Sequence, residues 1–192
     1  MKQNIKDAVM ASFVADALAL GVHWVYDIAA IKNKYGRLEQ MVVPEPAPYH
    51  KTKTKGQFTH YGDQALVLLE SVVEQSGFDP GHFSKKWQAM FADYTGYVDG
   101  ATKETLKNLS LDPDMNPSGS MSSDLGGAAR IASLALFYGD DPDAFVAAAK
   151  TQTAMTHNQS SVIDSARFFA LASTMVLMEK NHLLPLKRVW KR

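Results

Sequence analysis

The 192-residue sequence has no cysteine, no net charge and no long uninterrupted apolar run. The absence of cysteine excludes disulfides, thiolate zinc sites and cysteine nucleophiles, so a metal would need oxygen or imidazole ligands. It is also compatible with a reducing compartment. Because 20 Lys plus Arg balance 20 Asp plus Glu, no global field attracts nucleic acid or an anionic membrane, and we expect neither as a partner.

The N-terminus is like a signal peptide only in part. Lys2 and Lys6 precede the apolar stretch 8–15, but Asp7 and Asp16 interrupt the basic and apolar regions. No stretch reaches the roughly 18–20 apolar residues that a membrane span needs. We therefore expect a cytoplasmic chain. Its length and its 46% apolar content fit one globular domain over residues 1–192.

Apolar residues recur at helical spacing along most of the chain, and no stretch alternates convincingly like a strand. This pattern predicts about seven helices and an all-α fold, a single-domain helical bundle. The expected helices cover 4–20, 28–35, 63–75, 80–95 and 101–109, and others begin at 124, at 142 and after a serine cap at 160 or 161.

Two helix starts carry a strong local signal, because Asp79-Pro80 and Asp141-Pro142 each join a capping residue to a proline at the first helical position. Residues 36–62 contain three prolines and the alternating Lys-Thr run 51–55, so we expect an irregular loop there. The lysines of this run are interpreted as a solvated face rather than an anion clamp.

Two aspartates are candidate site residues. Asp16 falls on the apolar stripe of the helix at 4–20, where an unpaired charge would cost several kcal/mol, so we expect it to be buried with a polar partner. That partner is either structural or part of a site. Asp63 lies at the expected start of the next helix, after Thr59 and His60. Its carboxylate either caps or lies in the first turn of that helix, or belongs to a cation or phosphate site.

A further candidate is the segment 124–130, Asp-Leu-Gly-Gly-Ala-Ala-Arg. Its small residues allow close approach of a ligand to a helix N-terminus, or tight packing of two helices, and the residues alone favour packing. His23 follows the first helix, and the sequence alone leaves open whether it is a core histidine or a ligand.

Three short motifs follow one another along the chain. They are ADALALGVHW at 15–24, YGDQ at 61–64 and DLGGAARI at 124–131, and Thr156-His157 lies beyond them. Together they resemble the ADP-ribosylglycohydrolase family, especially its branch that includes J1-crystallin. The resemblance implies an all-helical fold. It also implies two Mg²⁺ ions that hold ADP-ribose and help cleave its glycosidic link, with ADP-ribose or an ADP-ribosylated small molecule or protein as partner.

The same resemblance shows departures from the family. Where the family has Thr-Asp-Asp-Thr, this chain has Tyr61-Gly62-Asp63-Gln64, which leaves Asp63 as the counterpart of a metal ligand. His23 stands near the position of a family glutamate, and imidazole cannot replace a carboxylate acceptor. No Asp-x-Asp-Thr element follows before Arg192, so we expect either a shortened member or a cut reading frame. Magnesium binding is therefore expected to be degenerate.

The resemblance also implies roles for individual residues. Asp63 and Asp16 would be catalytic, positioning water at the anomeric carbon, and Asp63 would also be the metal ligand. Backbone N–H groups of the 124–130 segment would meet phosphate, and His60 or His157 would supply acid–base function. The implied substrate-binding residues are His23, Thr59, His60, Gly126, Gly127, Arg130 and His157.

The alternative function is a non-catalytic, crystallin-like structural or binding protein that kept the scaffold and lost the metals. A separate expectation follows from the missing C-terminal part. Helices that the family covers with later segments would here expose apolar side chains, with Phe168, Phe169, Val176 and Leu177 as candidates. Such exposure favours a homo-oligomer.

Overall fold

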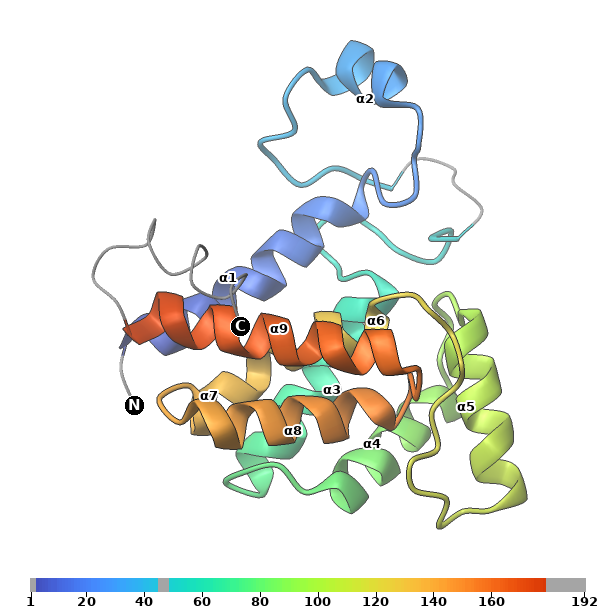
Figure 1. Ribbon diagram of the computed structural model, residues 1–192. Helices are drawn as coiled ribbons and strands as arrows, with labels where there is room; N and C mark the ends of the chain where they lie inside the picture. Colours follow the sequence, from blue (N-terminus) through green and yellow to red (C-terminus); the bar gives the residue numbers. More distant parts are fainter. Residues whose placement is uncertain (1–2, 45–48, 179–192) are drawn as a thin grey trace.

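The computed structural model describes residues 3–44 and 49–178, and this part of the chain is helical without a strand (Figure 1). The predicted all-α class is therefore confirmed. The helices are α1 (Gln3–Leu20), α2 (Ile28–Tyr35), α3 (His60–Glu74), α4 (Pro80–Ala92), α5 (Gly100–Leu111), α6 (Gly126–Ala129), the 3₁₀ helix η1 (Ile131–Leu134), α7 (Ala135–Tyr138), α8 (Pro142–Ala154) and α9 (Ser160–Met178).

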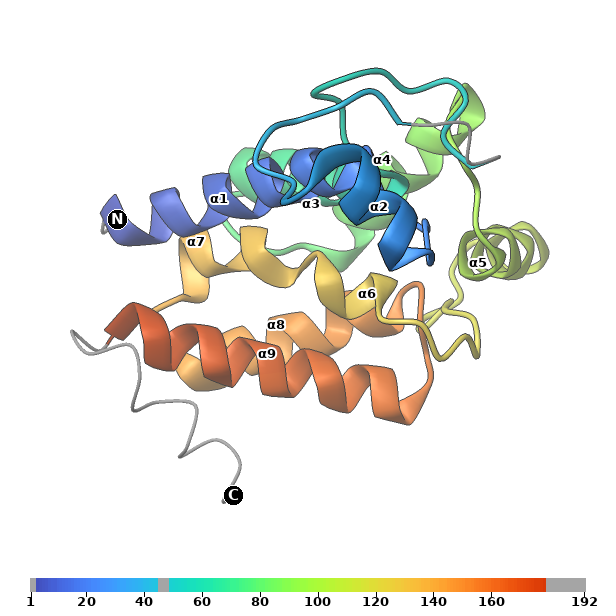
Figure 2. The same ribbon diagram turned by 90° about the horizontal axis from the view of Figure 1, so that it is seen from above.

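The helices form three layers, which Figure 2 shows from above. Helices α1, α3 and α4 lie on one side, and the pair α8 and α9 lies on the other. The broken helix α6–η1–α7 passes between them and contacts both layers. Helix α2 and the irregular chain around it project from this body, above the N-terminal end of α3 in Figure 1.

One apolar core joins the layers. It contains one side of α4, where Phe83 and Trp87 are buried. Burying a side chain of this size contributes roughly 1.5–3 kcal/mol. Other members of the core cluster are Leu68, Val72, Leu134, Phe145, Val162 and Ala166.

The two Asp-Pro caps read from the sequence are confirmed. The Asp79 side chain accepts a hydrogen bond from the His82 N–H at 2.7 Å, and Asp141 accepts one from the Ala144 N–H at 3.0 Å. Asp99 caps α5 in the same way, accepting from the Thr102 N–H at 2.6 Å.

Helix α3 begins three residues before the predicted position, at His60 rather than Asp63. The cap is Thr59, whose hydroxyl accepts from the N–H groups of Tyr61 and Gly62 at 3.1 and 3.4 Å. Asp63 lies in the first turn and its N–H donates to the Thr59 carbonyl at 2.9 Å. Of the two positions expected for Asp63, the first turn is confirmed and the cap is wrong, because a threonine hydroxyl one turn earlier already satisfies the helix start.

Three other boundaries differ from the prediction. The helix expected from 124 is only the four residues of α6, without a side-chain cap. The cap of α9 is Gln159 rather than a serine, since its side chain accepts from the N–H of Ser161 at 2.6 Å. Helix α4 ends at Ala92, which leaves Tyr94 in the following loop.

The expected irregular loop is confirmed over 36–44 and 49–59. Residues 45–48 and 179–192 lie outside the described residues. The second of these ranges is the one in which the sequence has no Asp-x-Asp-Thr counterpart.

Among the described helices, α9 is long and apolar enough to cross a membrane by length and composition alone, with a mean hydropathy of 1.3. The prediction that no stretch has this length and hydropathy is therefore wrong. Core helices of globular proteins pass the same test, and α9 buries Val162, Ala166, Ala170 and Thr174. It packs along α8, and this is the most extensive contact between two of the described elements.

An apolar cavity of about 360 Å³ lies between α1, η1–α7 and α9, lined by Val9, Ala132, Val176 and Leu177 among others. On α9, Phe168 is 38% exposed and Phe169 is 39% exposed. These exposures agree with the apolar surface that motivated the expected homo-oligomer, and self-association stays a prediction.

Candidate functional site

Asp63 is held by a cation of the chain itself. The ammonium of Lys53 donates to Asp63 Oδ2, and the hydroxyl of Tyr94 donates to the same oxygen at 2.5 Å. The side chains of Lys53 and Asp63 are only 12% and 18% exposed. The expectation that the whole lysine run faces solvent is therefore wrong for Lys53, because a partly buried carboxylate attracts an ammonium more strongly than water-exposed groups do.

Asp16 has the polar partner that its place on the apolar stripe predicted. Its carboxylate accepts from the N–H of Thr59 at 2.8 Å and from the Thr59 hydroxyl at 2.6 Å. Asp16 is half-buried, and burial raises its pKa although both bonds from Thr59 act in the opposite direction. Thr59 thus links α1 to α3, since one hydroxyl donates to Asp16 and also caps the helix.

A buried polar chain, the Arg130 network, connects α3, α6 and the segment after α8. Its members are Gln64, Arg130, Thr156, His157 and Asp124. The guanidinium of Arg130 donates to Gln64 Oε1 at 2.8 Å and to the Thr156 hydroxyl. Thr156 Oγ1 lies 3.0 Å from His157 Nδ1, and His157 Nε2 lies 3.1 Å from Asp124 Oδ1. Burial lowers the pKa of Arg130 to about 10, so the guanidinium is still charged at neutral pH.

Gly126 and Gly127 are sites of close packing. A Cβ on Gly126 would lie 2.6 Å from a ring carbon of Tyr61, and one on Gly127 would lie 3.0 Å from His157 Nδ1. The Gly126 N–H donates to Asp124 Oδ1 at 2.7 Å. This geometry agrees with the interpretation that the small residues allow tight packing. The Asp124 carboxylate also occupies the position near the Gly126 N–H that a phosphate would need.

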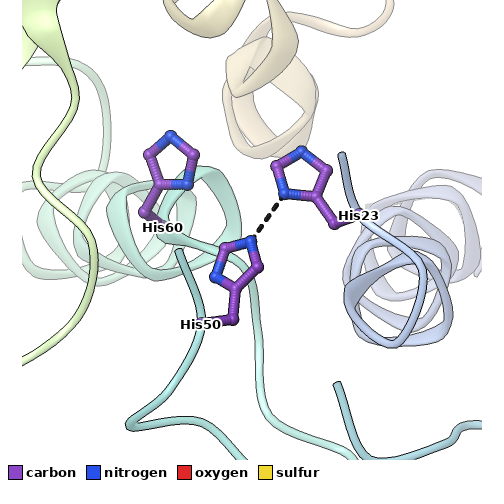
Figure 3. A group of neighbouring side chains, drawn as sticks. All are labelled: His23, His50 and His60. Carbon is purple, nitrogen blue, oxygen red and sulfur yellow. Dashed lines mark hydrogen bonds between the residues drawn. The ribbon is translucent and has the colours of Figure 1, made fainter. Parts of the chain in front are cut away.

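Next to these groups, three histidines from separate segments meet; we call them the histidine cluster. His23 Nδ1 lies 2.7 Å from His50 Nε2, and the ring of His60 is 5.9 Å from that of His23 between centroids (Figure 3). His60 Nε2 also lies 3.2 Å from Asp99 Oδ2. Burial, followed by the neighbouring histidines, lowers the pKa of both His23 and His50 to about 4.

The histidine cluster is surrounded by aromatic rings. Trp24 stacks on His23 with centroids 4.5 Å apart, and it meets Tyr49 and Tyr97 edge to face at 4.8 and 5.1 Å. The backbone of Trp24 has a φ of 62°, which is uncommon for a residue with a side chain. Such strain persists where the surroundings fix the conformation, and it often marks a functional site.

Acid titration is expected to weaken the Arg130 network through Asp124. The hydrogen bond from His157 lowers the pKa of Asp124, and the Gly126 N–H lowers it further. A carboxyl whose folded pKa lies below its unfolded value of 3.8 stabilises the fold above that pH, and the stabilisation is lost as the pH falls toward the folded pKa. Urea denaturation between pH 7 and 3 should therefore show a shallower acid loss for Asp124→Asn than for the parent. The exposed Asp140→Asn is the control, and parallel curves for parent and Asp124→Asn would contradict the assignment.

The sequence model of the ADP-ribosylglycohydrolase family matches residues 1–192. The chain belongs to this family. Crystallin J1A of Tripedalia cystophora is 32% identical over 111 residues, which are 55% of this chain and 33% of the crystallin. Crystallin J1B of the same organism is 29% identical over 107 residues, with the same shares. These similarities support the resemblance to the J1-crystallin branch.

Two further relatives are similar along nearly the whole chain. An uncharacterized protein of Archaeoglobus fulgidus is 24% identical over 193 residues, covering 100% of this chain and 62% of that protein. A solved structure described as an ADP-ribosylglycohydrolase-related protein complex has a TM-score of 0.73 at 23% identity, covering 91% of this chain and 56% of that one. The structural likeness shows the fold, and the chain spans less than two thirds of these family relatives.

The residues around Asp63 do not fit the magnesium site that the family implies. Mg²⁺ prefers octahedral oxygen coordination with carboxylate and water ligands. Asp63 Oδ2 is already bonded to Lys53 and Tyr94, and a second cation there would lie against the Lys53 ammonium. Asp16, the nearest other carboxylate candidate, uses both of its oxygens for Thr59.

The predicted site residues lie around the N-terminal end of α3, where they belong to three different groups of contacts. Asp16, Thr59 and Asp63 are adjacent, while His23 and His60 belong to the histidine cluster. Arg130 and His157 are each 2% exposed and bonded within the Arg130 network. Their substrate-binding roles and the catalytic roles of Asp16 and Asp63 stay predictions.

Sequence reasoning missed several residues of the site: Lys53, His50, Tyr94, Tyr97 and Asp99. A local signal existed only for Asp99, which lies two residues before the helix predicted at 101–109 and could have been read as its cap. The others lie in loops, where no periodicity indicates which side chains turn inward.

Proposed function

We propose that this member of the ADP-ribosylglycohydrolase family recognises the ADP-ribosyl group without magnesium-dependent hydrolysis. The observation that carries the proposal is the contact of Lys53 and Tyr94 with Asp63. Metal-assisted hydrolysis needs a cation that polarises the substrate and fixes a water molecule. A lysine ammonium supplies charge but has no coordination positions for water, so the chain keeps a positive group there and loses this chemistry.

Recognition is supported by family membership and by the aromatic side chains beside α3. Trp24 and Tyr97 are half-buried, and Tyr49 is 38% exposed, so the rim of this cluster offers ring faces and edges for a purine. The cavity lined by Asp16, Tyr61 and Arg130 measures only about 70 Å³. Sites for small molecules of this size class are usually about 300–1,000 Å³, so the nucleotide would bind along the open rim rather than inside.

The test is calorimetry with ADP-ribose, with and without Mg²⁺, together with a hydrolysis assay on ADP-ribosyl-arginine. We expect binding that Mg²⁺ leaves unchanged, and no magnesium-stimulated turnover. Lys53→Ala should introduce a magnesium dependence of binding, because Asp63 then lacks its ammonium. Lys55→Ala, an exposed lysine of the same run, is the control. Magnesium-stimulated turnover that Asp63→Ala abolishes would overturn the proposal.

A second candidate is a purely structural role, which the similarity to crystallins J1A and J1B favours. The contact between Lys53 and Asp63 suits it equally well, since an internal ion pair stabilises a scaffold without any ligand. The same calorimetry separates the two functions. Absence of ADP-ribose binding at millimolar concentration, in a chain that unfolds cooperatively, would favour the structural role.

A further inference from the structure

The histidine cluster brings together imidazoles from three segments that are distant in the sequence. His23 lies in the turn after α1, His50 lies in the irregular loop, and His60 is the first residue of α3. One ring nitrogen from each residue lies within 4.8 Å of the other two. Figure 3 shows the three rings turned toward a common space, with a nitrogen of each ring directed inward.

Two of the three histidines in this cluster have a buried ring nitrogen without a hydrogen-bond partner. His50 is 2% exposed and His60 is 1% exposed. Within the described part of the chain, His50 Nδ1 and His60 Nδ1 have no hydrogen-bond partner, and His60 Nε2 has only its 3.2 Å ion-pair contact with Asp99 Oδ2. A buried polar atom without a partner costs roughly 1–3 kcal/mol. His60 Nδ1 is the unpartnered nitrogen that faces the other two histidines, whose His23 Nδ1 and His50 Nε2 lie 2.7 Å apart (Figure 3). A ligand that accepts nitrogen lone pairs would remove part of this cost.

We propose that His23, His50 and His60 bind a transition-metal ion of borderline softness, represented by Zn²⁺, with a fourth position for water or a ligand. Zn²⁺ binds imidazole nitrogen at about 2.0–2.1 Å in tetrahedral geometry, which places neighbouring ligand nitrogens about 3.3 Å apart. The 2.7 Å between His23 and His50 is shorter and the 4.8 Å limit is longer, so metal binding needs ring shifts of roughly 1 Å. His23 and His50 lie in a turn and a loop, so such a shift does not require a helix to move.

Asp99 is placed to orient His60 for this role. Metal-binding histidines usually present their second ring nitrogen to a carboxylate or carbonyl. His60 Nε2 lies 3.2 Å from Asp99 Oδ2, so His60 Nδ1 is the nitrogen for the metal. Asp99 is itself fixed as the cap of α5 by the Thr102 N–H. The metal would therefore connect α1 and the irregular loop to α3, and through Asp99 to α5.

The ligand set also selects the metal. Three imidazoles suit Zn²⁺, Cu²⁺ or Ni²⁺, whereas Mg²⁺ prefers carboxylate, carbonyl and water oxygens. This site is thus chemically different from a carboxylate magnesium pair. It does not depend on the proposed recognition of ADP-ribose.

Equilibrium dialysis of the tag-free, chelator-treated 192-residue chain against Zn²⁺ tests the proposal. We expect one zinc ion per chain, no competition from millimolar Mg²⁺, and a higher melting temperature with zinc. Co²⁺ should give the intense visible absorption of a four-coordinate nitrogen site. Absence of stoichiometric binding, or a cobalt spectrum of six-coordinate oxygen ligation, would overturn the proposal.

Variants locate the site. His50→Gln should weaken zinc binding more than about 100-fold, since it removes a ligand, and Asp99→Asn should weaken it about 10–100-fold while an asparagine still caps α5. The control is His82→Gln, because both ring nitrogens of His82 have partners in Ser71 and Glu74. Circular dichroism of the metal-free variants reports whether they fold. Unchanged zinc binding in folded His50→Gln, or an equal loss in His82→Gln, would refute the assignment.

Discussion

Arg130→Ala is expected to lower the free energy of unfolding by about 3–5 kcal/mol, because it leaves a cavity and removes the hydrogen bonds of a buried charged group. Arg130 is 2% exposed, and its guanidinium bonds Gln64 and Thr156 at the junction of three layers. Truncation leaves a cavity and removes the donor to the Thr156 hydroxyl. Gln64 keeps one donor, the Trp87 indole N–H at 2.8 Å, so the loss falls mainly on the Thr156 side.

Urea denaturation of matched variants measures this effect. Arg167→Ala, an exposed arginine on α9, is the control and should change stability by less than about 0.5 kcal/mol. Arg130→Met keeps most of the side-chain volume. The difference in unfolding free energy between Arg130→Met and Arg130→Ala therefore reports the cavity, and the difference between the parent and Arg130→Met reports the lost hydrogen bonds. A change below about 1 kcal/mol in Arg130→Ala would show that the network is not structural, and would return Arg130 to the substrate-binding role.

Gly62→Ala is expected to destabilise the chain by about 2–3 kcal/mol through overpacking. A Cβ at this position would lie 2.6 Å from Asp16 Cγ and 2.8 Å from Phe58 Cβ, closer than real Cβ contacts. Asp16 would have to leave Thr59, so the helix cap and the contact between α1 and α3 would weaken together. The position that departs from the family's paired carboxylates is therefore one where this chain has no room for a side chain.

The matched control for this change is Gly100→Ala. Gly100 is the first residue of α5, and a Cβ there would meet nothing within 4 Å. Alanine should be neutral or stabilising by up to about 1 kcal/mol, because it restricts the unfolded chain. Thermal unfolding of both variants gives the comparison. Equal melting temperatures for Gly62→Ala and Gly100→Ala would refute the close packing of Asp16 on Gly62.

The sequence by itself determined the helices and their local signals. Apolar spacing predicted α1, α2 and α4, and Asp79-Pro80 and Asp141-Pro142 predicted two helix starts. The order of three short motifs also indicated the family. These features are readable because helix periodicity and capping depend on residues within about four positions of one another.

Only the tertiary structure decided which charges and rings meet. Asp63 is bonded to Lys53 from the loop before α3 and to Tyr94 from the loop after α4, while His50 joins His23 and His60. No periodicity relates these positions, because irregular loops leave side-chain direction to the packing of the whole chain. The sequence therefore identified Asp63 as the counterpart of a metal ligand in the family, whereas the fold decided that its partner is the Lys53 ammonium.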